Sequence, residues 1–173
     1  MTNLPPVSFG RRMAALVYEL LLVGVVTAVA SIVAGIAATA LNRTLPLISS
    51  FVVSLILLAF WWFYFKANWY KRGQTLPMKV WKIGLANQRG TRPSIVQLRM
   101  RFMWASLLIV LLPLVAYLML RQLMPQLPPH LAFGVALIWW ILPWGFAFFN
   151  ADRQFLYDHL AGTRLVDLTK NQI

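Results

Sequence analysis

The sequence predicts an all-α membrane protein: a four-transmembrane-helix bundle with a small cytoplasmic layer of short helices and an expected two-stranded sheet. Two facts of composition support this fold class, since 60% of the 173 residues are hydrophobic and only 12% are charged. Charged residues make up about a quarter of a soluble domain. In addition, four apolar runs are long enough, at about 1.5 Å per residue, to cross a hydrocarbon core about 30 Å thick.

These runs define the expected organisation of a single membrane domain, residues 1–173. The four expected spans are residues 13–41, 47–65, 102–120 and 131–149. The expected cytoplasmic loop is residues 66–101, and the expected cytoplasmic C-terminal segment is residues 150–173. The first run follows two arginines, as the apolar part of a signal peptide does. Its length is about twice the usual and it contains Glu19, so we expect a retained helix.

The positions of the basic residues predict the orientation. Fourteen of the 16 lysines and arginines fall in the N-terminal segment, the central loop or the C-terminal segment, and only Arg43 and Arg121 fall on the other side. By the positive-inside rule, the basic side faces the cytoplasm. Four crossings also return the chain to its starting side. We therefore expect a multi-pass membrane protein with both termini in the cytoplasm.

The loop and the C-terminal segment carry signals of ordered structure. Residues 81–87 alternate apolar and small or polar side chains, as a half-buried strand does, and residues 88–90 supply a turn. Pro77 excludes a regular helix running unbroken through the loop. After the fourth span, Asp152 could cap a short helix that Gly162 ends, and residues 163–168 read as a second strand. We expect the two strands to pair beneath the membrane.

The charge and composition also exclude several function classes. The net charge is +12, but the basic residues sit at the ends of apolar runs, so we expect no nucleic acid partner. The chain has no cysteine and only two histidines, His130 and His159, which makes a metal site unexpected. No nucleophile motif is recognisable either. We therefore expect no enzyme, no cofactor and no metal, and we expect the phospholipid bilayer and its anionic lipid headgroups as partners.

Glu19 is the most informative single residue because no other acidic residue lies inside an expected span. A charge at the centre of the hydrocarbon costs at least about 2.5 to 3.5 kcal/mol. Arg12 lies seven positions earlier, which places it within roughly 20° of the same helix face and about 10.5 Å along the axis. The two long side chains can approach each other.

Three interpretations of Glu19 follow from its position. It could bind a proton or a cation, with the balance of burial and the nearby Arg12 deciding its charge. It could instead be a fixed strut, paired with Arg12 or with a basic residue of the central loop. It could also be a carboxylate that reaches the headgroup region.

Three separated stretches, residues 11–19, 73–79 and 152–163, together resemble the bacterial RDD family of inner-membrane proteins. The resemblance covers nearly the whole chain in the right order. It is carried by an arginine pair ahead of the first span and by a cytoplasmic motif made of Gly73, Gln74, Thr75, Lys79, Asp152, Arg153, Gly162 and Thr163.

The resemblance implies an ion or structural ion-pair site, because the arginine of the family pattern falls on Arg12 and its two acidic positions fall on Glu19 and Asp158. The chain departs from that pattern with glutamate in place of the first aspartate, with Pro77 where glycine is common and with His159 where arginine is common. Glutamate keeps the charge but carries it one methylene farther from the backbone. A structural ion pair tolerates this change better than a tightly sized ion site does.

Two functions from different classes are therefore expected. The leading one is a transport protein. The resemblance implies cation/proton exchange, which is attributed to some members of the RDD family. In this function Glu19 titrates, and Arg12 and Asp158 are its partners on the cytoplasmic side. Four helices are too few to enclose an ion pathway within one protomer, so this function needs a homo-oligomer. An interface for it is offered by the small residues Ala28, Ser31, Gly35 and Ala38. The alternative is a membrane scaffold or assembly factor that docks a protein partner or anionic lipid through its basic cytoplasmic face.

Overall fold

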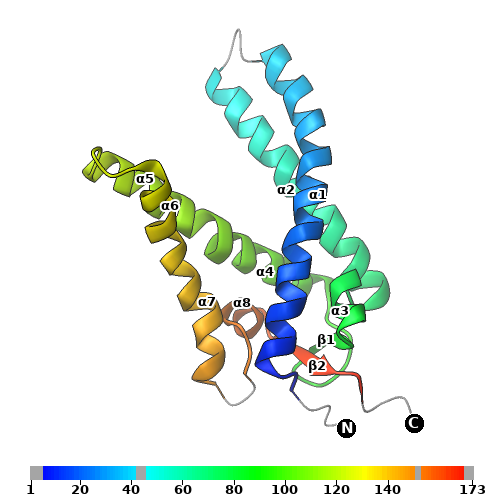
Figure 1. Ribbon diagram of the computed structural model, residues 1–173. Helices are drawn as coiled ribbons and strands as arrows, with labels where there is room; N and C mark the ends of the chain where they lie inside the picture. Colours follow the sequence, from blue (N-terminus) through cyan, green and yellow to red (C-terminus); the bar gives the residue numbers. More distant parts are fainter. Residues whose placement is uncertain (1–5, 42–45, 151–152, 170–173) are drawn as a thin grey trace. The chain divides into compact units, whose positions relative to one another are not determined.

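The computed structural model describes residues 6–41, 46–150 and 153–169. The chain divides into two compact units: Gly10–Lys82, here called the hairpin unit, and Met1–Phe9 with Ile83–Ile173, here called the sheet unit. In the described part of the chain, four helices are long and apolar enough to cross a membrane (Figure 1). The predicted all-α membrane fold with four spans and a small two-stranded sheet is therefore confirmed.

The hairpin unit consists of two long helices and a short one, α1 (Phe9–Leu41), α2 (Pro46–Arg72) and α3 (Leu76–Val80). A polar contact joins the long helices in their apolar middle, where the Trp61 indole N–H donates to Thr27 Oγ1 at 2.9 Å. The Thr27 hydroxyl in turn donates to the carbonyl of Val23 at 2.7 Å. Because lipid offers no hydrogen-bond partner, each of these polar groups needs such an internal partner.

The sheet unit holds the other two spans. The third span is one continuous helical run, made of α4 (Ile95–Ala105), the π-helical segment η1 (Ser106–Leu111) and α5 (Leu112–Leu123). The fourth span alternates α and 3₁₀ turns, with α6 (Pro129–Leu137), η2 (Ile138–Trp140), α7 (Ile141–Gly145) and η3 (Phe146–Phe148). Helices α5 and α6 pack against each other (Figure 1).

A proline explains an unusual contact between these two spans. Pro113 has no N–H, so it cannot donate to the carbonyl of Ile109 four residues earlier, as a residue at that point of an α-helix would. The Trp140 indole N–H donates to that carbonyl at 2.9 Å. The π-helical segment lies just before the proline. A side chain of the fourth span thus supplies a hydrogen bond that the backbone of the third span lacks.

The sheet pairs two segments that are far apart in the sequence. Strands β1 (Ile83–Asn87) and β2 (Thr163–Asp167) run antiparallel, with Leu85 opposite Leu165. Pro6 adds an isolated bridge to Val166. The predicted pairing of the two strands is confirmed, and it ties the segment after the second span to the segment after the fourth.

The structure corrects several predicted boundaries. Helix α2 continues to Arg72 and α4 begins at Ile95, so the connection between the two spans is shorter than residues 66–101 and holds α3 besides the expected strand β1. Apolar runs end at the first charge, whereas long basic side chains can extend from a helix into the headgroup region without breaking it. The first strand begins at Ile83 and not at residue 81, because Lys82 has a left-handed backbone with φ 52°.

Candidate functional site

A carboxylate–hydroxyl cluster lies in the hairpin unit and joins its three helices. The Tyr64 hydroxyl of α2 donates to Glu19 Oε1 of α1 at 2.7 Å. The Thr75 hydroxyl, just before α3, donates to Glu19 Oε2. Both carboxylate oxygens therefore accept a hydrogen bond from a neutral hydroxyl. We call Glu19, Tyr64 and Thr75 the Glu19 cluster.

The motif that carries Thr75 is a tight connection between two helices. Gly73 adopts a left-handed backbone, φ 66°, directly after α2, and its N–H donates to the carbonyl of Trp69 at 2.9 Å. Thr75 is then the N-cap of α3, accepting from the Met78 N–H at 3.4 Å, with Pro77 in the first turn. Glycine and proline are typical of these two positions. The chain is thus turned so that the buried Thr75 hydroxyl meets Glu19.

The other end of α3 is also held by α1. The Arg11 guanidinium donates to the backbone carbonyl of Trp81 and, at 3.1 Å, to that of Lys82. A cation near the C-terminal carbonyls of a helix satisfies acceptors that have no partner within the helix. Side chains of α1 therefore hold α3 at both ends.

Replacing Thr75 tests this connection. Thr75→Val keeps the shape of the side chain but removes both the cap and the hydrogen bond to Glu19, and we expect a loss of about 1 to 2 kcal/mol of stability. Thr75→Ser keeps the hydroxyl and both hydrogen bonds and removes only a buried methyl group, so its loss should be smaller, about 0.8 kcal/mol. Denaturant unfolding in mixed micelles measures the difference. Equal stability of the two variants would contradict the proposed role of the hydroxyl.

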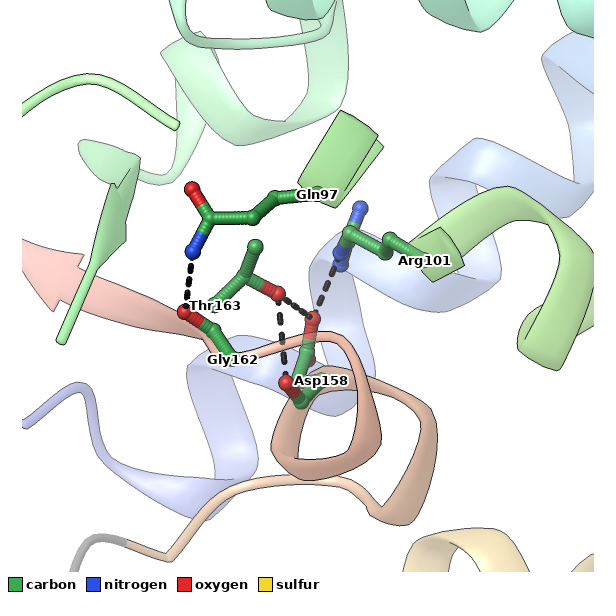
Figure 2. Close-up of polar contacts among 5 residues, drawn as sticks. All are labelled: Gln97, Arg101, Asp158, Gly162 and Thr163. Atoms are coloured by element: carbon green, nitrogen blue, oxygen red, sulfur yellow. Dashed lines mark hydrogen bonds and ion pairs between the residues drawn. The ribbon is translucent and has the colours of Figure 1, made fainter. Parts of the chain in front are cut away.

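A second polar cluster lies in the sheet unit around Asp158 (Figure 2). Asp158 is fully buried, and its Oδ1 lies 2.5 Å from Arg101 Nε, whose side chain is 8% exposed. The Thr163 hydroxyl contacts the carbonyl oxygen and Oδ1 of Asp158, each at 3.3 Å. The amide of Gln97 donates to the carbonyl of Gly162 at 3.1 Å. We call these five residues the Asp158 cluster.

Local sequence explains how the two halves of the Asp158 cluster meet. Gln97 and Arg101 are four residues apart, so they share one face of α4. Gln97 also closes a capping box with Ser94 at the start of that helix. On the other side, the short helix α8 (Leu156–Leu160) is followed by Gly162, whose φ of 64° turns the chain into β2. That turn brings Thr163 back over Asp158.

The structure places the predicted site residues in two separate groups. Glu19, Gly73, Gln74, Thr75 and Lys79 belong to the hairpin unit, and Asp158, Gly162 and Thr163 belong to the sheet unit. The prediction that Gly162 ends a short helix is confirmed. Asp152 lies outside the described residues, and the helix it was expected to cap begins at Leu156 after Phe155, which makes no side-chain cap. Arg153 lies in the turn before it, with its N–H donating to the carbonyl of Asn150 at 3.0 Å.

Arg12 is buried, with 1% of its surface exposed. It belongs to the hairpin unit, whereas Asp158 belongs to the sheet unit. The partnership of Arg12 with Glu19 and with Asp158 stays a prediction.

Sequence reasoning missed Tyr64, Arg101 and Gln97. Arg101 counted only as one of the basic residues that set the orientation. Arg101 follows Leu98 by three residues and therefore lies on the same face of the helix. Leu98 is fully buried. The burial of Leu98 is visible only in the structure, so the sequence carried no signal that singled out Arg101.

The chemistry of the two clusters is that of oxygen ligands and charged pairs. Within residues 6–41, 46–150 and 153–169, no group of three or more histidine, cysteine, aspartate or glutamate residues could hold a metal ion. The Glu19 cluster offers one carboxylate and two hydroxyls. It can hold a proton or a hard cation, and neither of these needs a set of several anionic ligands.

Comparison with known proteins gives one match. The model of the RDD family matches residues 6–162, a range that includes the Glu19 cluster and all of the Asp158 cluster except Thr163. No curated protein and no solved structure matches the chain significantly.

Proposed function

Because the chain belongs to the RDD family, we propose that this integral membrane protein exchanges a cation for a proton across the bacterial inner membrane. The observation that carries the proposal is the Glu19 cluster. A carboxylate lies in a membrane-crossing helix and both of its oxygens accept from hydroxyl groups. Ionisable groups inside spans are costly, and they are found along ion and proton pathways.

The ligand atoms of the cluster suit such an exchange. Glu19 contributes two oxygens and the hydroxyls of Tyr64 and Thr75 contribute one each. Hard cations prefer carboxylate, hydroxyl and carbonyl oxygens to nitrogen or sulfur. A hydroxyl donates to the ionised carboxylate when the site is empty and can turn a lone pair toward a bound cation. A proton on Glu19 removes the negative charge, so proton and cation compete for the same carboxylate.

In the proposed topology the Glu19 cluster lies toward the cytoplasmic side, since fourteen of the 16 basic residues fall on that side of the four apolar runs. A homo-oligomer would complete a pathway that four helices alone do not enclose. The small residues Ala28, Ser31 and Gly35 are exposed on α1. Small side chains let helices approach closely in lipid, which supports this face as the interface between protomers.

Reconstitution into liposomes that contain a pH-sensitive dye tests the proposal. An imposed cation gradient should drive proton flux through the parent protein and through Glu19→Asp, which keeps the carboxylate. Glu19→Gln keeps the size but cannot ionise, so its flux should fall to that of empty liposomes.

Membrane accumulation of each variant is the control. If parent and Glu19→Asp carry no proton flux under any cation gradient, the exchange proposal is wrong. If Glu19→Gln also fails to accumulate in the membrane, Glu19 is a strut.

A scaffold that docks a protein partner is the second candidate. The observation that favours it is the fold of the basic segment between the second and third spans, which forms α3 and β1 and is not an open loop. An ordered basic surface can present a fixed pattern of charge to a partner. Crosslinking from this segment in the native membrane should then recover one reproducible protein, and repeated recovery of none would contradict the scaffold.

A further inference from the structure

Helix α3 and the residue that follows it expose an apolar surface. The exposed fractions are 50% for Leu76, 58% for Val80 and 38% for Trp81. Leu76 and Val80 are four residues apart and lie on one face of the helix. Pro77 and Met78, on the other side, are buried. The segment thus has two apolar sides, of which only one is covered by the protein.

This exposed face is held in a defined orientation. The Thr75 hydroxyl joins the start of α3 to Glu19, and the Arg11 guanidinium joins its end at the carbonyls of Trp81 and Lys82. Both anchors come from α1, a membrane-crossing helix. The exposure of the apolar side chains is therefore a feature of an ordered segment.

Basic residues surround the face. Lys79 and Lys82 are exposed within it, and Lys71 and Arg72 are exposed at the end of α2 just before it. Residues 71–82 contain no aspartate or glutamate. The surface is therefore both apolar and positively charged, which favours an occupant that is both apolar and anionic.

The position of α3 in the chain indicates which occupant this is. Only three residues separate it from α2, whose apolar length crosses the membrane and ends in Lys71 and Arg72. A segment at that point lies at the level of the headgroups. Tryptophan and aliphatic side chains enter the boundary between headgroups and acyl chains, while lysines attract anionic lipids.

We propose that the α3 face, made of Leu76, Lys79, Val80, Trp81 and Lys82, binds anionic phospholipid. The apolar side chains enter the acyl boundary and the two lysines contact the negatively charged headgroup. This site does not depend on cation exchange by Glu19, because lipid binding at the α3 face needs no transport.

Quenching of Trp81 by brominated lipids tests the proposal. The purified protein is reconstituted in two mixtures of phosphatidylglycerol and phosphatidylcholine. In one mixture only the phosphatidylglycerol is brominated, and in the other only the phosphatidylcholine is brominated. Trp81→Phe provides the difference signal that isolates Trp81 from the other tryptophans. We expect brominated phosphatidylglycerol to quench Trp81 at a much lower mole fraction than brominated phosphatidylcholine does.

Removing two charges at the α3 face, and two charges elsewhere as a control, distinguishes a lipid-binding site from general attraction between a basic protein and anionic lipid. Lys79→Gln with Lys82→Gln should lower the preference for phosphatidylglycerol by about 10- to 30-fold. Arg89→Gln with Arg92→Gln removes the same charge from exposed positions of the turn after β1 and should leave the preference within about twofold. Equal quenching by the two lipids would overturn the proposal. So would an equal loss in the two double variants, since that result requires only bulk charge.

Discussion

Arg101→Met is expected to destabilise the protein by about 3 to 5 kcal/mol. Asp158 is fully buried, and the guanidinium nitrogen 2.5 Å from its Oδ1 is the close cationic partner within the Asp158 cluster. Methionine fills much of the space of the arginine stem but leaves the carboxylate charge without that partner. A buried charge that loses its partner costs far more than the intact pair contributes.

The matched control is Arg99→Met, the same substitution on an exposed position of the same helix. It should change stability by no more than about 0.5 kcal/mol. The double variant Arg101→Met with Asp158→Leu removes both charges and should recover most of the loss. Denaturant unfolding in mixed micelles compares the four proteins. A cost for Arg101→Met that equals the cost for Arg99→Met would contradict the buried ion pair.

Trp140→Phe is the second large expected effect, with a loss of about 1 to 3 kcal/mol. Phenylalanine keeps most of the apolar surface but has no N–H to donate to the carbonyl of Ile109. Pro113 cannot replace that donor. The carbonyl is then left without this hydrogen bond inside a membrane-crossing helix, where an unsatisfied backbone group is costly.

Two further variants separate the hydrogen bond from the loss of indole surface. Trp139→Phe changes the neighbouring tryptophan, which is 48% exposed, and should cost less than about 0.5 kcal/mol. Pro113→Ala restores a backbone N–H that can donate to Ile109. In that background Trp140→Phe should lose most of its effect. An undiminished cost of Trp140→Phe in the alanine background would show that the hydrogen bond is not the cause.

The membrane fold could be predicted from sequence because the hydropathy of a segment indicates directly whether it lies in lipid or in water. Four long apolar runs predict the number of spans. Alternation in residues 81–87 predicts the first strand, and residues 163–168, after the turn at Gly162, read as the second. The ends of the spans could not be predicted in the same way. Helices α2 and α4 continue through lysines and arginines, since the helix is held by backbone hydrogen bonds that do not depend on side-chain charge.

The candidate site was predicted only in part, for a different physical reason. Glu19 stood out because a carboxylate in a span requires compensation. Its hydroxyl partners did not, because Tyr64 is 45 positions away and Thr75 is 56 positions away along the chain. Arg101 is likewise 57 positions from Asp158. Contacts at such separations are set by how the helices pack, and the pattern of one sequence does not contain that information.

The Glu19 cluster also bears on the two leading interpretations of that residue. Hydrogen bonds from two other elements make Glu19 a connection between α1, α2 and the start of α3, as a strut would be. The same hydroxyls are suitable ligands for a cation, as an exchange site would need. Binding of a cation in competition with a proton distinguishes an exchange site from a strut, since a carboxylate that is only a strut binds no cation and shows no such competition.

Cation-dependent thermal stability of the purified protein tests this central claim most directly. A cation that binds the folded protein raises its melting temperature by mass action. We predict that alkali chlorides raise the melting temperature of the parent at alkaline pH, that the increase shrinks at mildly acidic pH, and that choline chloride at the same ionic strength has no such effect. Glu19→Gln should abolish the increase. An equal increase with choline, or in Glu19→Gln, would contradict competition of a cation and a proton for Glu19.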